Sequence, residues 1–150
     1  MSDLGTEKVL RPVVEGWLQT RGYYVAHEIM ICGYCDLVGC RWHKRIGRRI
    51  PIMSKIVTVE LKIRDISGVL YQAKNNCYYV DYSYAAMPMS KCKSMRYATL
   101  YKFKEEGIGL LGINHCVNIV IPARRNKIIH NSNICRRLWN FKIRHRFDNE

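Results

Sequence analysis

Residues 57–62 read Val57-Thr58-Val59-Glu60-Leu61-Lys62 and alternate between apolar and polar side chains. Alternate residues of a β-strand share one face, so the three apolar residues are expected to point into a core. Thr58, Glu60 and Lys62 would then point together to the other side. An acid and a lysine two positions apart on a buried strand favour a metal bound by the acid, beside a cation that orients water or a phosphate.

The neighbouring sequence predicts an α/β fold with a mixed central sheet and helices on both faces. An apolar helical pattern covers residues 9–18, interrupted by Pro12, and Gly22 follows it as a stop signal. The remaining pattern predicts strands over 23–31, 36–40 and 56–63, a short helix opened by Ser67-Gly68, a strand over 78–86, a helix from Ser90 to Gly107, strands over 108–113 and 117–121, and a basic helix over 131–147.

Asp36 is a second candidate carboxylate, because it opens the strand that precedes the Glu60 strand. If these strands pair as a meander, Asp36 and Glu60 can meet on one face. Two carboxylates at one place repel each other and raise one pKa unless a cation lies between them. Mg²⁺ fits this requirement, because it takes oxygen ligands and keeps several waters for a substrate phosphate.

Asp36 followed by Glu60-Leu61-Lys62 resembles the PD-(D/E)xK signature of the restriction-endonuclease-like nuclease superfamily. Cys35 stands where the motif usually has proline. The resemblance covers roughly residues 6–113 and implies an αβββαβ core. Other features agree with it: Thr6-Glu7 on the first helix, Gly22-Tyr23 closing that helix, Gln72-Ala73 on the helix after the motif, and the later segment 107–111.

The resemblance also implies a role for each matching residue. Asp36 and Glu60 would coordinate one or two Mg²⁺ ions, with help from the backbone carbonyl of Leu61, and Mn²⁺ would substitute. Lys62 would position or help to deprotonate the attacking water. Gln72 would line the site from the following helix. An acid on the first helix would reach the metal through water: Glu7 matches this position, and Glu15 is its rival.

The chain has 150 residues, with 25 Lys and Arg against 12 Asp and Glu, a formal charge of +13 that points to a polyanionic partner, most simply DNA. The surplus is concentrated in an insertion over 41–55, between the two proposed metal-ligand strands, and in a carboxyl-terminal segment over 124–147. The residues expected to contact phosphates are Arg41, Lys44, Arg45, Arg48, Arg49, Arg124, Arg125, Arg136 and Arg137.

A zinc site is an alternative use of the segment that contains Asp36. Four residues of types that bind zinc lie within a stretch of twelve: Cys32, Cys35, Cys40 and His43. Residues at such spacings along a strand cannot all converge, however, and the other cysteines lack partners at a metal-binding spacing. We therefore favour buried free thiols over zinc.

The length fits one nuclease domain over residues 1–150, and the lack of a long apolar run or a secretory leader predicts a cytoplasmic protein without a membrane partner. The expected function is a Mg²⁺-dependent deoxyribonuclease, a structure-selective or partner-directed endonuclease resembling small Holliday-junction resolvases and phage or mobile-element nucleases. A resolvase would act as a homodimer. The alternatives are a non-catalytic basic DNA-binding module and a subunit active only in a larger recombination or defence complex.

Overall fold

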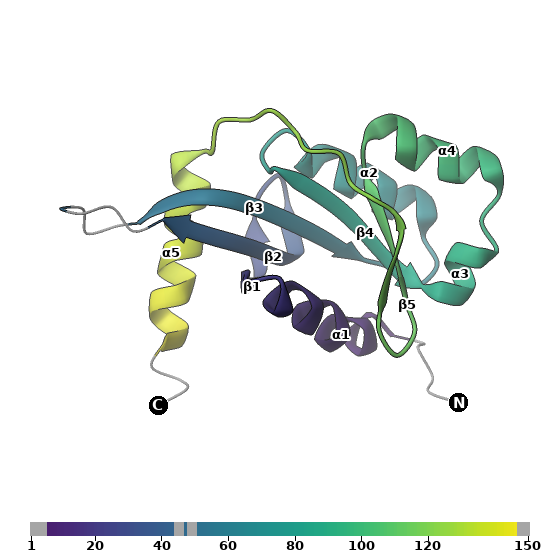
Figure 1. Cartoon of the computed structure of the whole chain (residues 1–150), viewed down its shortest axis with the longest axis horizontal. Helices are drawn as coiled ribbons and strands as arrows, with labels where there is room; N and C mark the ends of the chain where they lie inside the picture. The colour runs from purple at the N-terminus through teal and green to yellow at the C-terminus, as the bar shows by residue number, and fades with distance from the viewer. Residues whose placement is uncertain (1–5, 44–46, 48–50, 147–150) are drawn as a thin grey trace.

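The computed structural model describes residues 6–43, 47 and 51–146 of the chain. These residues form six strands and five helices in a mixed α/β arrangement (Figure 1). In chain order the elements are α1 (Glu7–Thr20), β1 (Tyr24–Met30), β2 (Tyr34–His43), β3 (Ile52–Leu61), α2 (Ile66–Asn76), β4 (Tyr82–Pro88), α3 (Met89–Lys93), α4 (Tyr97–Glu106), β5 (Gly109–Ile113), β6 (Val117–Ile121) and α5 (Ser132–Arg146).

The strands form one mixed sheet in the order β1-β2-β3-β4-β5-β6. The first three strands pair as an antiparallel meander, β3, β4 and β5 are parallel, and β6 returns antiparallel to β5. Parallel neighbours require crossover connections, which α2 supplies between β3 and β4, and α3 with α4 supply between β4 and β5. The prediction of a mixed sheet flanked by helices is confirmed.

Alternation along the strands separates the core into layers on the two faces of the sheet. Val57, Val59 and Leu61 pack with the buried α1 residues Leu10, Val14 and Leu18, as the pattern of residues 57–62 predicts. On the opposite face, α5 covers β1 and β2 through Ile134 and Leu138, and α2 and α4 cover the other half through Val69, Ala73 and Phe103. Figure 1 shows α5 at the β1–β3 half of the sheet, whereas α1 runs in a different direction, from β1 toward β5.

Several element boundaries differ from those predicted. The strands β2 and β3 are both longer than expected, because they pair with each other over seven residue pairs as far as His43 and Ile52. The strand β4 starts later, at Tyr82, and Tyr79 lies in the preceding turn; β4 also includes Pro88 rather than stopping before it. The helix expected from Ser90 to Gly107 is two helices, α3 and α4, separated at residues 94–96.

The first helix runs through Pro12 and begins at Glu7, five residues before the proline. The buried residues of this helix lie on one face, because Leu10, Val14 and Leu18 follow each other at intervals of four residues. The second helix is capped by Asp65, whose side chain accepts a hydrogen bond from the backbone N–H of Gly68, so Ser67 is not the cap.

The basic insertion predicted over 41–55 consists partly of strand. Arg41, Trp42 and His43 belong to β2, and residues 52–55 belong to β3. The predicted phosphate ligands Lys44, Arg45, Arg48 and Arg49 lie outside the described residues. No helix in the described part of the chain is long and apolar enough to cross a membrane.

Candidate active site at the end of the β2–β3 ladder

Asp36 and Glu60 lie on neighbouring strands, one position beyond the last paired residues of β2 and β3. The ladder ends at the Leu37–Val59 pair. Beyond it, the Asp36 carboxylate accepts a hydrogen bond from the backbone N–H of Leu61, with Oδ2 and the nitrogen 2.8 Å apart. The meander therefore brings together the two carboxylates that the sequence places 24 residues apart.

Glu60 is almost completely buried, with 3% of its surface exposed. Its pKa is raised to about 7, mainly because burial disfavours the charged form and also because the Asp36 carboxylate is near. Hydrogen bonds from Asn76 and Cys35 act in the opposite direction. The Asn76 Nδ2 atom lies 2.9 Å from Oε1 of Glu60. Glu60 is thus a carboxyl group whose ionisation a cation would favour.

Asn76 is a site residue that sequence reasoning missed. It belongs to the last turn of α2, is 3% exposed, and its amide also lies 3.8 Å from the Cys35 sulfur. The available signal was its spacing, because Asn76 follows the predicted site residue Gln72 by four positions on one helix. A buried amide that donates to a carboxylate orients the carboxylate and limits which of its oxygens is free.

Gln72 and Thr58 each carry a buried polar oxygen without a hydrogen-bond partner in the described part of the structure. Thr58 is completely buried on the same strand as Glu60, two positions before it. Gln72 lies on α2, as predicted, with its unpaired atom being the acceptor Oε1. An unpaired buried acceptor is unfavourable, so a donor such as bound water would satisfy the Gln72 oxygen.

Lys62 directs its amine toward the first helix. Its Nζ atom lies 3.3 Å from Oε1 of Glu7, and both side chains are partly exposed. Glu15 instead pairs with His27 at 3.2 Å. Glu7 is therefore the first-helix acid that contacts Lys62. Strand alternation predicted that Lys62 would share a side with Thr58 and Glu60, and it did not predict the contact with Glu7. Lys62 lies just beyond the end of β3, where strand alternation no longer directs the side chain.

The described residues contain no cluster of three His, Cys, Asp or Glu side chains close enough to hold a metal ion. A metal at this site would have Asp36 and Glu60 as its two carboxylates, and its other ligands would be backbone oxygen and water. Mg²⁺ commonly uses one or two carboxylates with several waters. The neighbouring carboxylates and the raised pKa of Glu60 fit an ion of this type.

The cysteines of the zinc alternative have different surroundings. Cys32 is exposed, whereas Cys35 and Cys40 are buried in β2. The Cys35 thiol contacts the carbonyl of Leu37 at 3.3 Å. Burial, with the nearby Glu60, raises the pKa of Cys35 well above its usual value, so this thiol stays protonated beside the carboxylates.

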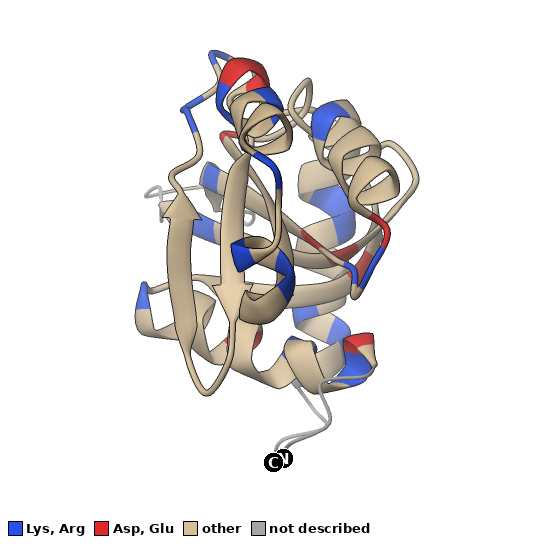
Figure 2. Ribbon diagram, turned by 90° about the vertical axis from the view of Figure 1, so that its right-hand side faces the viewer, with Lys and Arg blue, Asp and Glu red and all other residues tan. Residues whose placement is uncertain are grey.

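The basic residues predicted to bind nucleic acid have different neighbours. Arg41 lies over the Tyr23 ring, Arg125 is 3.8 Å from Asp81, and Arg137 donates to the Met30 carbonyl at 2.9 Å. Arg124 packs beside Gly107, and Arg136 is exposed on α5. Figure 2 shows Lys and Arg on several helices and strands around the molecule, so the charge is spread over many elements in this view.

No family model, curated protein or solved structure matches this chain.

Proposed function

We propose that this protein is a metal-dependent deoxyribonuclease with a restriction-endonuclease-like core, which hydrolyses phosphodiester bonds as an endonuclease. One observation carries the proposal: Asp36 and Glu60 lie beside each other at the end of the β2–β3 ladder, and the chain continues from Glu60 to Lys62 within two residues. The order of elements supports the proposal. The chain runs through a helix, an antiparallel meander, a second helix and a parallel strand, which is the order that the PD-(D/E)xK resemblance implies.

The residues that would hold Mg²⁺ are Asp36, Glu60 and the backbone carbonyl of Leu61, with Glu7 acting through water. Once bound, the ion would lower the pKa of a bound water and neutralise charge on the phosphate. Burial and the Asp36 carboxylate raise the pKa of Glu60, and a cation would reverse the second of these effects. The donor set consists of oxygens, which matches the preference of Mg²⁺ and Mn²⁺ rather than that of zinc.

Lys62 would act on water and on the phosphate. Its ammonium group is paired with Glu7 at 3.3 Å and is partly exposed, so a nucleic-acid phosphate can compete with Glu7 for it. Asn76 donates to Oε1 of Glu60 and so orients this carboxylate. Gln72 contributes a buried acceptor that can hold a water molecule. These groups would together orient water and stabilise negative charge in the transition state.

A cleavage assay tests the proposal. Duplex, single-stranded, flap and four-way-junction DNA should be incubated with the protein and Mg²⁺ or Mn²⁺, and with EDTA as the negative control. We expect Asp36→Asn, Glu60→Gln and Lys62→Met each to reduce cleavage at least 100-fold on the preferred DNA, whereas Glu105→Gln, an exposed acid on α4, should retain activity. Undiminished cleavage by all three site variants would disprove the proposed assignment of the site.

A non-catalytic DNA-binding module is the second candidate, favoured by the fact that the described residues offer two close carboxylates and no group of three. This function predicts salt-dependent binding of all the DNA substrates without cleavage of any. A subunit active only in a larger complex predicts the same result for the isolated protein and cleavage once its partner is added. A junction-resolving homodimer predicts paired cuts across a four-way junction.

A further inference from the structure

A hollow of about 400 Å³ lies on the α1 face of the sheet, away from the carboxylates. The end of α1 and the strands β2, β3, β4 and β6 line it. Its floor includes Val57 and Leu18, which belong to the core layer beneath α1. Glu60, by contrast, bonds to Asn76 of α2, which covers the opposite face of the sheet. The hollow is therefore a separate place from the candidate active site.

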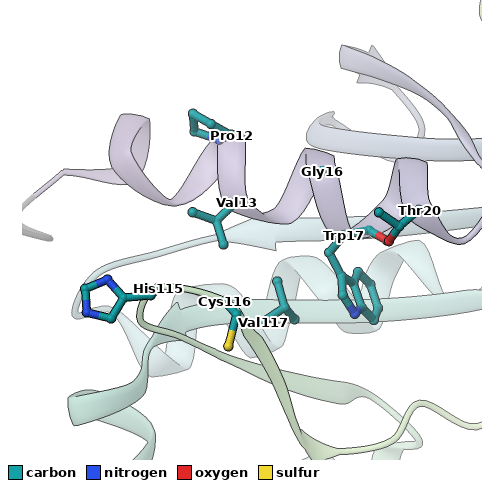
Figure 3. Close-up of a pocket in the computed structure, with 8 residues that line it drawn as sticks. All are labelled: Pro12, Val13, Gly16, Trp17, Thr20, His115, Cys116 and Val117. Carbon is teal, nitrogen blue, oxygen red and sulfur yellow. The ribbon is translucent and has the colours of Figure 1, made fainter.

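Aromatic rings form the walls of this hollow. Trp17 of α1 and Tyr84 of β4 meet edge to face, with their ring centroids 5.7 Å apart. Tyr82, two residues before Tyr84 on the same strand face, and Tyr23 complete the aromatic lining. Trp17 also lines an adjoining hollow of about 450 Å³ between α1 and the β5–β6 hairpin, where its indole extends from the helix toward Val117 (Figure 3).

Three cations surround the rings. Arg21 lies over Trp17 with its guanidinium carbon 4.2 Å from the ring centroid, and Arg41 lies over Tyr23 at the same distance. The Lys55 amine is 5.5 Å from the centroid of Tyr82. The residues that line the hollow include no acid, and none of these three cations has a carboxylate within ion-pair distance among the described side chains.

Arg41 and Lys55 are direct partners in the antiparallel pairing of β2 with β3. Like charges opposite each other on neighbouring strands destabilise the sheet. The Arg41 guanidinium is partly compensated, because it donates to the carbonyl of Arg21 at the end of α1, where a helix favours cations. Within residues 6–43, 47 and 51–146, the neighbour found for the Lys55 ammonium is the Tyr82 ring. An anion bound between the three cations would relieve the repulsion that the sheet imposes.

We propose that this hollow binds a nucleoside phosphate, with the base among the aromatic rings and the phosphate between Arg21, Arg41 and Lys55. The uncompensated cations select an anion, and the apolar floor and aromatic walls select a ligand with a flat ring rather than a bare ion. Bases stack on aromatic rings and on guanidinium planes alike. A volume of about 400 Å³ is within the range of small-ligand sites.

The nucleoside phosphate can be a free nucleotide or one unit of a single strand. Glu60 lies five positions after Lys55 along β3, which corresponds to about 16 Å of strand. The proposal does not depend on the nuclease activity, because it concerns different residues from those of the candidate active site.

Binding of fluorescein-labelled single-stranded (dT)10 to the full chain, followed by fluorescence anisotropy in EDTA, tests the proposal. We expect Lys55→Gln and Arg21→Gln each to weaken binding at least fivefold and to reduce the salt dependence by about one counterion. Lys102→Gln, an exposed lysine of α4 on the opposite face, is the matched control and should change the affinity less than twofold. If all three variants changed the affinity for (dT)10 equally, the assignment of the phosphate site to this hollow would be overturned.

The role of the base is tested with an abasic strand of equal length. We expect the wild type to bind the abasic strand at least fivefold more weakly than (dT)10, and Trp17→Leu to remove most of this difference. If Trp17→Leu unfolds, Tyr82→Leu provides the same comparison, with circular dichroism as the check on folding. Equal binding of both strands by the wild type would overturn the assignment of a base to the hollow.

Competition separates the two sources of the ligand. Displacement of (dT)10 by millimolar dTMP, but not by the same concentration of inorganic phosphate, would support binding of free nucleotides. Failure of dTMP to compete, with the variant effects intact, would support a strand as the ligand. Equal competition by dTMP and phosphate would overturn the proposal in favour of a plain anion site. The binding assay is carried out in EDTA and detects no cleavage, so failure of the nuclease proposal leaves this result unaffected.

Discussion

The carboxylate of Asp36 on β2 is tied to the backbone of Leu61 on β3 by a hydrogen bond of 2.8 Å. This contact joins the two strands beyond the end of their regular pairing and places Asp36 beside Glu60. Burial, with a smaller contribution from the neighbouring Asp36 carboxylate, raises the pKa of Glu60 to about 7. Both the proposed metal binding and the pH dependence of stability follow from this geometry.

Stability should decrease as the pH rises from about 4.5 to about 7. In this window the folded protein keeps the Glu60 proton while the unfolded chain, with a pKa of 4.5, has released it. The folded state therefore binds more protons, and the free energy of unfolding falls with increasing pH. Glu60→Gln should remove this component and stabilise the protein at pH 8 by about 1–3 kcal/mol.

Urea unfolding of the wild type and Glu60→Gln at pH 4, 6 and 8 measures the effect. The two proteins should differ least at pH 4, where Glu60 is protonated in both the folded and the unfolded states. Glu105→Gln, at an exposed position, serves as the control and should follow the wild type. A constant difference between the wild type and Glu60→Gln across the pH range would contradict the raised pKa.

Divalent metal should stabilise the folded protein at pH 8. A ligand that binds only the folded state at 100 times its Kd adds about 2.7 kcal/mol to the free energy of unfolding. We expect 5–10 mM Mg²⁺ or Mn²⁺ to raise Tm in the wild type and to have little effect on Asp36→Asn or Glu60→Gln. Thermal unfolding measured with the metal and with the same ionic strength of NaCl separates specific binding from screening; identical shifts in all proteins would indicate no site at these carboxylates.

Gly109 should not tolerate a side chain. A methyl group at this position would overlap the ring of Tyr84 on β4 and lie 2.9 Å from the backbone nitrogen of Ala123. Since the backbone of Ala123 cannot move away without shifting the chain that leaves β6, Gly109→Ala should lower the free energy of unfolding by about 1–3 kcal/mol.

Gly16 provides the matched comparison. It lies inside α1, and a methyl group there meets no other atom within 4 Å. Because alanine has a higher helix propensity than glycine, Gly16→Ala should raise the free energy of unfolding by about 0.5–1 kcal/mol. Chemical denaturation of both variants provides the measurement; effects of the same sign would be incompatible with the packing described around Gly109.

Leu138 should contribute strongly to the attachment of α5. Its side chain is completely buried among β1 and β2 residues that include Ala26 and Val38. Leu138→Ala should reduce the free energy of unfolding by about 2–5 kcal/mol, through lost burial and the remaining cavity. Ile129→Ala, at a side chain that is 96% exposed, should change it by less than about 0.5 kcal/mol. Similar unfolding midpoints for the two variants would contradict the docking of α5.

The sequence by itself determined the architecture at the level of elements. Alternation over residues 57–62 correctly predicted that Val57, Val59 and Leu61 face a core. The apolar pattern of residues 9–18 predicted the first helix, which the structure places against that core. These signals are readable because side-chain direction repeats with the period of each element, which is a local property. Boundaries were less predictable, since the lengths of β2 and β3 depend on how far the two strands pair.

Only the tertiary structure decided which side chains meet. Strand register brings Asp36 to Leu61, the crossover of α2 brings Asn76 to Glu60, and the end of β3 leaves Lys62 free to reach Glu7 on α1. The hollow that contains Arg41 and Lys55 arises in the same way, from residues that are distant along the chain but opposite each other across two strands. Such contacts depend on register and on the path of connections, and neither follows from a periodic pattern within one element.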